Sequence, residues 1–387
     1  MTPFVLPVRY HQQDASDFCG EAVVQMIVAS QDDGIVDQSA LRSAHGGSSG
    51  TTADEACDLL NGHVLRGERF AVRGDPDPKD GMRRIVETLT ATRTAVAVPI
   101  YGGTHWVAVT GAVLDGDPRA PEIRGLFVNN PEPPAPPPPP NPHSDADPCG
   151  AVTTDPNSQF GSANTFVSTF EWLGGEWRKP APYDGQDVFV TVGRGDATEP
   201  GLRGAPVLEP PRGSLEPRDA AAAANLGVAA FALDADGSPL AAFVRGAGAG
   251  PHDVFPVTRI PRQATRGSAE PYHIVSMRRG GDVVALARIG SQDGRFLSLQ
   301  APPAYLPAPD EMFDFASAAM RRWQEETMRR GDVHDFTVHP SLVWRPSLQS
   351  MSPFYPFAQI NVAGRILYAG MNGRIYLRLV RHPVTVS

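Results

Sequence analysis

Cysteine and lysine are scarce in this chain, and each scarcity narrows the kind of protein it can be. Among 387 residues there are three cysteines and only two lysines, Lys79 and Lys179. Three cysteines leave at least one thiol unpaired and are too few for a disulfide scaffold or a four-thiolate zinc site. A reducing compartment is therefore expected. The use of arginine in place of lysine, together with much Ala, Gly and Pro, is typical of a GC-rich bacterial genome.

Long apolar runs, a secretory signal and basic surface blocks are also missing. No run approaches the ~18 apolar residues of a membrane span. Met1 to Arg9 lacks the basic segment and apolar stretch of a secretory signal. The formal net charge is -9, which disfavours nucleic-acid binding. We expect a soluble, cytoplasmic protein without membrane insertion, although delivery elsewhere by a non-classical route stays open.

Residues 1–195 are predicted to form one α+β unit, with helices first and an antiparallel sheet after them. The segment from Thr51 to Leu60 has threonine caps, early acids and an Asn61-Gly62 stop, which together indicate a helix. Further helices are expected at the apolar segment that follows Cys19 and over 37–44 and 81–90. Strands are expected over 95–100, 106–111, 125–128 and 187–192.

Two stretches interrupt this pattern. From Pro131 to Pro142 nine of twelve residues are proline, which favours a stiff polyproline segment. Residues 131–163 are therefore predicted to be an inserted loop. The Pro/Gly/Glu/Arg-rich stretch at 196–218 is predicted to be a linker between two domains.

Residues 219–387 are predicted to form a second, sheet-rich α+β domain. Asp236-Gly237, Gly280-Gly281 and Asn372-Gly373 each lie between two apolar runs and predict β-hairpins, the first of which would join 228–233 to 240–245. A helix is expected over 311–330 because its apolar residues recur on one face. The role of this domain is open, and recognition of a substrate or protein partner is the expectation.

Cys19 is the most informative residue. It ends the stretch Gln13-Asp-Ala-Ser-Asp-Phe-Cys19 and precedes an apolar segment. Helix N-termini carry about half a positive charge and unsatisfied N–H groups, so a cysteine in the first turn is favoured as thiolate. The apolar face begins only after Gly20, so Cys19 is expected at an exposed lip, with the glycine keeping bulk away from the sulfur. The alternative is a small core residue, which is the expectation for Cys57.

Two later segments offer the partners that a cysteine nucleophile needs. His105 follows Gly102-Gly103 and precedes an apolar strand, so it can take the proton of Cys19 and return it to a leaving group. Asn130 stands before a proline, which favours an extended backbone, and its carboxamide can orient the imidazole. Asn129 is the alternative for this role. If neither amide has a catalytic role, the Asn129-Asn130 dipeptide is simply a turn before the proline tract. The Gln13 side chain can donate an N–H to a developing oxyanion.

In this order and spacing, the region resembles the papain-like cysteine peptidases, and most of all the C39 family and its C39-like relatives. The matching segments are Gln13 before Cys19-Gly20, Gly50 to Leu60, Thr94 to Gly111, Asn130-Pro131 and the aromatic segment Phe166 to Leu173. The resemblance covers about half the chain. It implies that Gln13 is the oxyanion donor, Cys19 the nucleophile, His105 the base and Asn130 the orienting residue. Many relatives have Asp in place of this Asn, and the long Pro-rich insertion also departs from their pattern.

The expected function is therefore cysteine-dependent cleavage of peptide or protein substrates, and this chemistry needs no metal or organic cofactor. Two alternatives stay open. Papain-like folds also host acyl transfer, deamidation and glutamine cross-linking with the same residues. A vestigial site would instead make the domain a non-catalytic peptide-binding module. A cation site is a further possibility in the loop, where a solvated tract is the simpler interpretation; its residues are His143, Asp145, Asp147 and Cys149.

Overall fold

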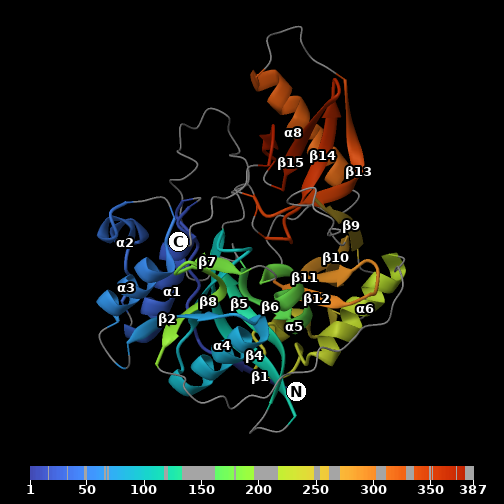
Figure 1. The fold of residues 1–387 in the computed structure, drawn as a ribbon. Coiled ribbons are helices and arrows are strands. Elements are labelled where there is room, and N and C mark those ends of the chain that lie inside the picture. Colours follow the sequence, from blue (N-terminus) through green and yellow to red (C-terminus); the bar gives the residue numbers. More distant parts are fainter. Residues whose placement is uncertain are drawn as a thin grey trace.

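Figure 1 shows the fold of the chain as a computed structural model. The structure describes all residues except the following: 16, 33, 48–49, 65–66, 68, 117–120, 133–161, 178–179, 196–216, 248–252, 261–270, 302–310, 328–334, 348–349, 351, 372 and 380–387. The predicted linker at 196–218 lies outside the described residues except for its last two positions. The predicted insertion at 131–163 is described only at its two ends.

The first four helices of the first half form where the sequence predicts them, and a fifth helix and a π-helical turn that it did not predict follow. They are α1 (Cys19–Asp32), α2 (Gln38–Ala44), α3 (Ala53–His63) and α4 (Pro78–Thr92), followed by α5 (Thr169–Glu171) and the π-helical turn η1 (Trp172–Glu176). The Thr52 hydroxyl accepts a hydrogen bond from the backbone N–H of Glu55, whose carboxylate accepts one from the backbone N–H of Thr52. This capping box satisfies two of the N–H groups that the start of α3 leaves open.

The strands of the first half pair in antiparallel fashion, and helices cover both faces of their sheet. They are β1 (Thr2–Val5), β2 (Phe70–Asp75), β3 (Val96–Ile100), β4 (His105–Asp115), β5 (Glu122–Asn130), β6 (Ser162–Ser168), β7 (Ala181–Tyr183) and β8 (Gln186–Arg194). Strand β4 shows the division. Trp106 and Ala108 belong to the core with α1 and α3, whereas Val107 and Val109 belong to the core with α4 and η1. Side chains alternate along a strand, so a strand covered on both faces is apolar throughout.

The second half contains eight strands and three helices among its described residues. They are α6 (Pro217–Ala230), α7 (Ala241–Val244), β9 (Asp253–Arg259), β10 (Tyr272–Arg279), β11 (Asp282–Gly290), β12 (Phe296–Gln300), α8 (Glu311–Thr327), β13 (Phe336–Trp344), β14 (Phe357–Val362), β15 (Arg365–Gly370) and β16 (Ile375–Tyr376). The hairpin predicted at Gly280-Gly281 is confirmed as β10 and β11, and the one at Asn372-Gly373 as β15 and β16. The predicted helix over 311–330 is confirmed over residues 311–327 as α8, and its last three positions lie outside the described residues.

The hairpin predicted around Asp236-Gly237 is wrong. Residues 228–230 continue α6, and residues 241–244 form the short helix α7. Five consecutive alanines, Ala220 to Ala224, lie in α6. Alanine has the highest helix propensity, and the helix that it favours continues into the apolar run that the turn signal assigned to a strand. Gly237, with a φ of +90°, ends up in a connection between two helices.

The two halves share one sheet. Its strand order is β16-β15-β14-β13-β9-β10-β11-β12-β6-β5-β4-β3-β8-β2, and the halves meet where Leu299 of β12 pairs with Phe166 of β6. Only β9 and β13 pair in parallel among the described strands. Figure 1 shows α1 to α3 at one end of this sheet, α6 beside β9 to β11 near its middle, and α8 on β13 to β15 toward the other end. The architecture is α+β, as predicted. No helix within the described residues is long and apolar enough to cross a membrane.

Candidate active site

Cys19 is the first residue of α1, but it is only 2% exposed and does not lie at an open lip as expected. Gly20 has a packing role beside it. A Cβ on Gly20 would lie 2.3 Å from Oγ1 of Thr51, so the glycine lets α1 approach the segment that leads into α3. The Trp106 indole N–H donates a 2.8 Å hydrogen bond to the carbonyl oxygen of Thr51. The first turn of α1 is therefore packed between β4 and the start of α3.

The burial of Cys19 also decides its protonation state. Burial raises the pKa of the Cys19 thiol to about 12; the backbone N–H of Trp106 opposes this shift, and the carboxylate of Glu21 adds to it. The direction of this shift runs against the resting thiolate expected from the helix terminus, because the loss of hydration opposes the N–H groups at the start of the helix. The hydrogen bond from the backbone N–H of Trp106 also places the sulfur of Cys19 against the residue that follows His105.

His105 and Asn130 come together at the rim of the sheet. His105 begins β4 and Asn130 ends the neighbouring strand β5. Nε2 of His105 lies 2.8 Å from Oδ1 of Asn130, and the backbone N–H of Glu132 donates to the same Oδ1 over 3.0 Å. A backbone N–H can only donate, so Oδ1 is the acceptor in both contacts. In the neutral imidazole Nε2 then carries the proton, and Nδ1 is the nitrogen that can accept one.

The structure separates the two candidate amides. Asn129 is paired with Ala108 and is fully buried, and its Oδ1 accepts a 2.7 Å hydrogen bond from the backbone N–H of Asn164. Successive residues of a strand face opposite sides, so Asn129 points away from the face that Asn130 shares with His105. The amide that contacts the imidazole is that of Asn130.

Gln13 lies at the same rim. Its backbone N–H donates a 2.8 Å hydrogen bond to the carbonyl oxygen of Pro131, which ties it to the end of β5. Its side chain is buried, and Nε2 donates to the carbonyl oxygen of Ala15 over 2.9 Å. The amide nitrogen carries two N–H groups, so a second donor remains for an oxyanion. The Tyr10 hydroxyl, which the sequence did not single out, holds the same rim by donating to the carbonyl oxygen of Asn130 over 3.0 Å.

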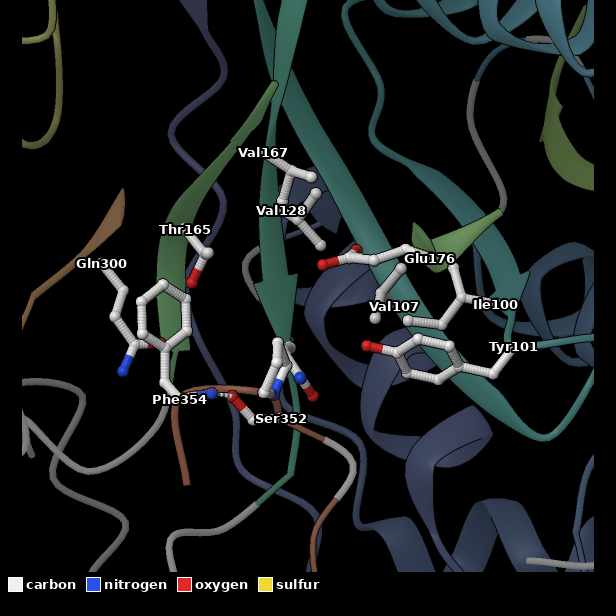
Figure 2. Close-up of a pocket in the computed structure, with 12 residues that line it drawn as sticks. Ile100, Tyr101, Val107, Val128, Thr165, Val167, Glu176, Gln300, Ser352 and Phe354 are labelled. Carbon is white, nitrogen blue, oxygen red and sulfur yellow. Dashed lines mark hydrogen bonds between the residues drawn. The ribbon is translucent and has the colours of Figure 1, made fainter. Parts of the chain in front are cut away.

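A narrow pocket lies beside Asn130, with a cavity volume of about 20 Å³, roughly the space of one water molecule. Figure 2 shows Glu176 and Tyr101 on one side of it and Gln300, Ser352 and Phe354, from the second half of the chain, on the other. The Glu176 side chain reaches toward Val128 of β5. Burial raises the pKa of this carboxyl to about 7, and the neighbouring carboxylate of Glu171 adds to the shift. Both halves therefore build the surface next to the candidate site.

The sequence did not reveal a charged cluster directly behind Cys19. Glu21, in α1, is fully buried and is bound by Arg42 and His45, which come from α2 and the residue after it. The signal that could have found it is an acid in the first turn of a helix whose next residues are mostly apolar. Its partners follow no periodic pattern, so only the fold brings them to it.

Of the other residues that the sequence singled out, Cys57 lies in the core and the tract from His143 to Cys149 lies outside the described residues. Cys57 is buried in the core with α1 and α3, as expected, and its thiol donates to the carbonyl oxygen of Phe70 over 3.3 Å. The possible cation tract from His143 to Cys149 lies outside the described residues. Within the described part of the chain, no three His, Cys, Asp or Glu side chains form a group that could hold a metal ion.

Comparison of the chain with models of protein families, with curated proteins and with solved structures finds no significant match. The function has to be argued from the geometry of the site itself.

Proposed function

We propose that this protein is a cysteine-dependent peptidase that cleaves peptide or protein substrates in the cytoplasm, and that residues 1–195 form a papain-like domain of the C39 type. The observation that supports it most is the contact between His105 and Asn130. His105 precedes Trp106, whose backbone N–H contacts the sulfur of Cys19. This arrangement gives a thiol, a base with a defined tautomer and a group that orients the base. Residue types alone would not provide that combination.

In the first half-reaction, the thiol of Cys19 attacks the carbonyl carbon of the scissile bond while Nδ1 of His105 takes its proton. The tetrahedral oxyanion is held by the second amide N–H of Gln13 and by the backbone N–H of Cys19. The imidazolium then gives its proton to the leaving amine, the carbon–nitrogen bond breaks, and a thioester remains. Because the resting thiol is protonated, His105 acts as a general base during the attack.

In the second half-reaction, water attacks the thioester. His105 takes a proton from the water and returns it to the sulfur as the carbon–sulfur bond breaks, which releases the carboxylic acid and restores the thiol. Throughout both steps Asn130 keeps Nε2 of His105 protonated and so holds Nδ1 toward the reacting atoms. The chemistry runs without a metal or an organic cofactor.

The second half of the chain is proposed to take part in recognition of the substrate or a protein partner. The support is the pocket beside Asn130, to which Gln300 and the segment Ser352 to Phe354 contribute a wall.

The experiment that tests the proposal compares wild type with His105→Ala, Asn130→Ala and Cys19→Ser. Cleavage of protein substrates is followed by profiling of newly formed N-termini. We expect no cleavage by Cys19→Ser, a loss on the order of 10²–10⁴-fold for His105→Ala because the base is removed, and a smaller loss for Asn130→Ala. Asn129→Ala is the matched control and should keep the wild-type pH profile. Wild-type cleavage by Cys19→Ser would contradict the proposal.

A non-catalytic peptide-binding module is the second candidate, and the burial of Cys19 favours it, because a buried neutral thiol is a poor nucleophile. Alkylation by iodoacetamide, mapped by mass spectrometry, separates the two functions. If the protein is a peptidase, iodoacetamide should modify Cys19 faster than Cys57, and the His105→Ala variant should lose this difference. A binding module should show no such preference. Cross-linked or deamidated products in place of fragments would instead indicate the acyl-transfer alternative.

A further inference from the structure

A buried polar cluster lies behind the first turn of α1, and its ionisable groups come from three neighbouring helices and the loop between two of them. Glu21 is fully buried at its centre. Arg42 places Nε 2.6 Å from Oε1 of Glu21, at an angle unfavourable for a hydrogen bond, and donates from Nη2 to Oε2 over 3.1 Å. Nε2 of His45 lies 2.7 Å from the same Oε1, and Nδ1 of His45 lies 3.6 Å from Oε1 of Glu55 in α3.

The described contacts of Arg42 are concentrated on the stretch that holds Cys19. Nη2 donates to the carbonyl oxygen of Asp17 over 2.7 Å, and Nη1 lies 3.3 Å from the Asp17 carboxylate. The guanidinium also stacks on the ring of Phe18, 4.4 Å from its centre. With Glu21, these contacts bracket Cys19 on both sides in sequence. A planar guanidinium can hold several acceptors at fixed angles, which a lysine ammonium cannot do.

The cluster also acts on the sulfur electrostatically. The Glu21 carboxylate is two residues from Cys19 and raises the pKa of its thiol. A buried carboxylate without a partner would be costly and would oppose any thiolate nearby. The guanidinium of Arg42, in contact with both oxygens, neutralises that charge. The cluster thus keeps an acid next to the nucleophile without letting its full charge reach the sulfur.

We propose that Arg42 is a positioning residue for Cys19: it holds residues 17–21 as one unit and shields the sulfur from the charge of Glu21. This role rests on the function proposed above, because positioning matters only if Cys19 reacts. A purely structural role makes a different prediction, since loosening the start of α1 would expose the thiol and speed its modification.

The test measures the rate of iodoacetamide alkylation of Cys19 in the full-length protein from pH 6 to pH 9. Alkylation follows the thiolate fraction, so one unit of pKa appears as a tenfold change in rate at fixed pH. In Glu21→Gln, we expect Cys19 to be alkylated about tenfold faster than in wild type. The reason is that a nearby charge typically shifts the pKa of a thiol by about one unit or more. In Arg42→Gln, Cys19 should be alkylated about tenfold more slowly than in wild type. The Cys19 alkylation rate of the double variant should lie between those of the two single variants.

The matched control is Arg84→Gln. Arg84 binds both oxygens of Asp75 over 2.8 and 2.9 Å, in a part of the fold away from α1. This variant should lower stability while leaving the Cys19 rate unchanged. If Arg42→Gln does not fold, Arg42→Lys replaces it. Lysine cannot contact both oxygens of Glu21 as the guanidinium does, so the shielding weakens and we expect Cys19 to be alkylated several-fold more slowly than in wild type.

A wild-type or faster rate in Arg42→Gln, or in Arg42→Lys where only that variant folds, would overturn the inference. This outcome is distinct from failure of the proposed function, which shows as an unchanged Cys19 rate in His105→Ala whatever the Arg42 variants do.

Discussion

Glu171 and Glu176 lie five residues apart and are both buried, yet their pKa values shift in opposite directions. Burial raises both, but Arg288 and Arg259 each contact Oε1 of Glu171, over 2.7 and 3.1 Å, and hold its pKa below the usual value. Both guanidiniums are nearer to Glu171, so the pKa of Glu176 rises to about 7. At the scale of single residues, the partner that the fold supplies decides the charge.

Glu176 should make the stability of the protein fall as the pH rises. Its folded pKa of about 7 lies above the unfolded value of 4.5, so the folded state binds more protons between these values and loses stability as pH rises through them. The loss is at most about 3 kcal/mol at 1.36 kcal/mol per unit. Glu176→Gln removes this loss, so its stability relative to wild type should increase from pH 5 to pH 8.5. Urea denaturation at each pH measures the difference.

The control for this prediction is Glu326→Gln, which changes an exposed glutamate on α8. It should track wild type at every pH. A Glu176→Gln variant whose stability advantage does not grow with pH would show that this carboxyl is already ionised in the folded protein at neutral pH.

At the scale of elements, the start of α1 depends on close packing against the residues before α3. A Cβ on Gly20 would meet Oγ1, Cβ and Cγ2 of Thr51 at 2.3, 2.4 and 3.0 Å. The backbone of Thr51 is itself held by the Trp106 indole, so the threonine has little room to move. The position of Cys19 is therefore set by the glycine next to it and by the contact of that glycine with Thr51, a residue far along the chain.

Gly20→Ala should destabilise the protein by about 1–3 kcal/mol, the usual cost of overpacking a filled core. Thr51→Gly removes all three atoms in conflict, so the double variant should recover part of the loss beyond additivity. Thermal or urea denaturation of wild type, the two single variants and the double variant measures this double-mutant cycle.

Gly62→Ala provides a contrast. Gly62 lies in α3 with nothing within 4 Å of an added Cβ, and the change should stabilise the protein by about 0.5–1 kcal/mol. Additive effects of Gly20→Ala and Thr51→Gly would contradict the packing argument.

At the scale of the whole molecule, the two halves are joined by more than the pairing of β6 with β12. Glu171 lies in the first half, and its partners Arg288 and Arg259 lie in the second. Arg288 is fully buried, donates to Ser298 over 3.2 Å and stacks on Tyr272. Separation of the halves would leave a carboxylate without its partners and would open an edge strand.

Arg288→Met should therefore destabilise the whole protein by about 3–5 kcal/mol, as expected for a buried ion pair with one partner removed. Hydrogen exchange should show that β5 and β11 lose protection together because they belong to one sheet. Arg245→Met is the control: its ion pair with Asp236 is exposed on both sides, so stability should change little. Loss of protection in only one half would show that the halves unfold independently.

The sequence by itself determined helices α1 to α4, two of the three hairpins, the general α+β class and the candidate partners of Cys19. These depend on short-range signals: caps, turn dipeptides and apolar periodicity act within about ten residues along the chain. The same locality explains the failure around Asp236, where the turn signal competed with a run of alanines and lost. The catalytic roles of Gln13, Cys19, His105 and Asn130 stay predictions until activity is measured.

Only the tertiary structure decided that Cys19 is buried with a raised thiol pKa, that Asn130 rather than Asn129 contacts the imidazole, and that Arg42 and His45 contact Glu21. It also decided that the two halves share a sheet. Each of these depends on segments that lie far apart in sequence and meet only when the chain packs. Burial and protonation are properties of that packing, because hydration is removed by whichever residues the fold brings alongside.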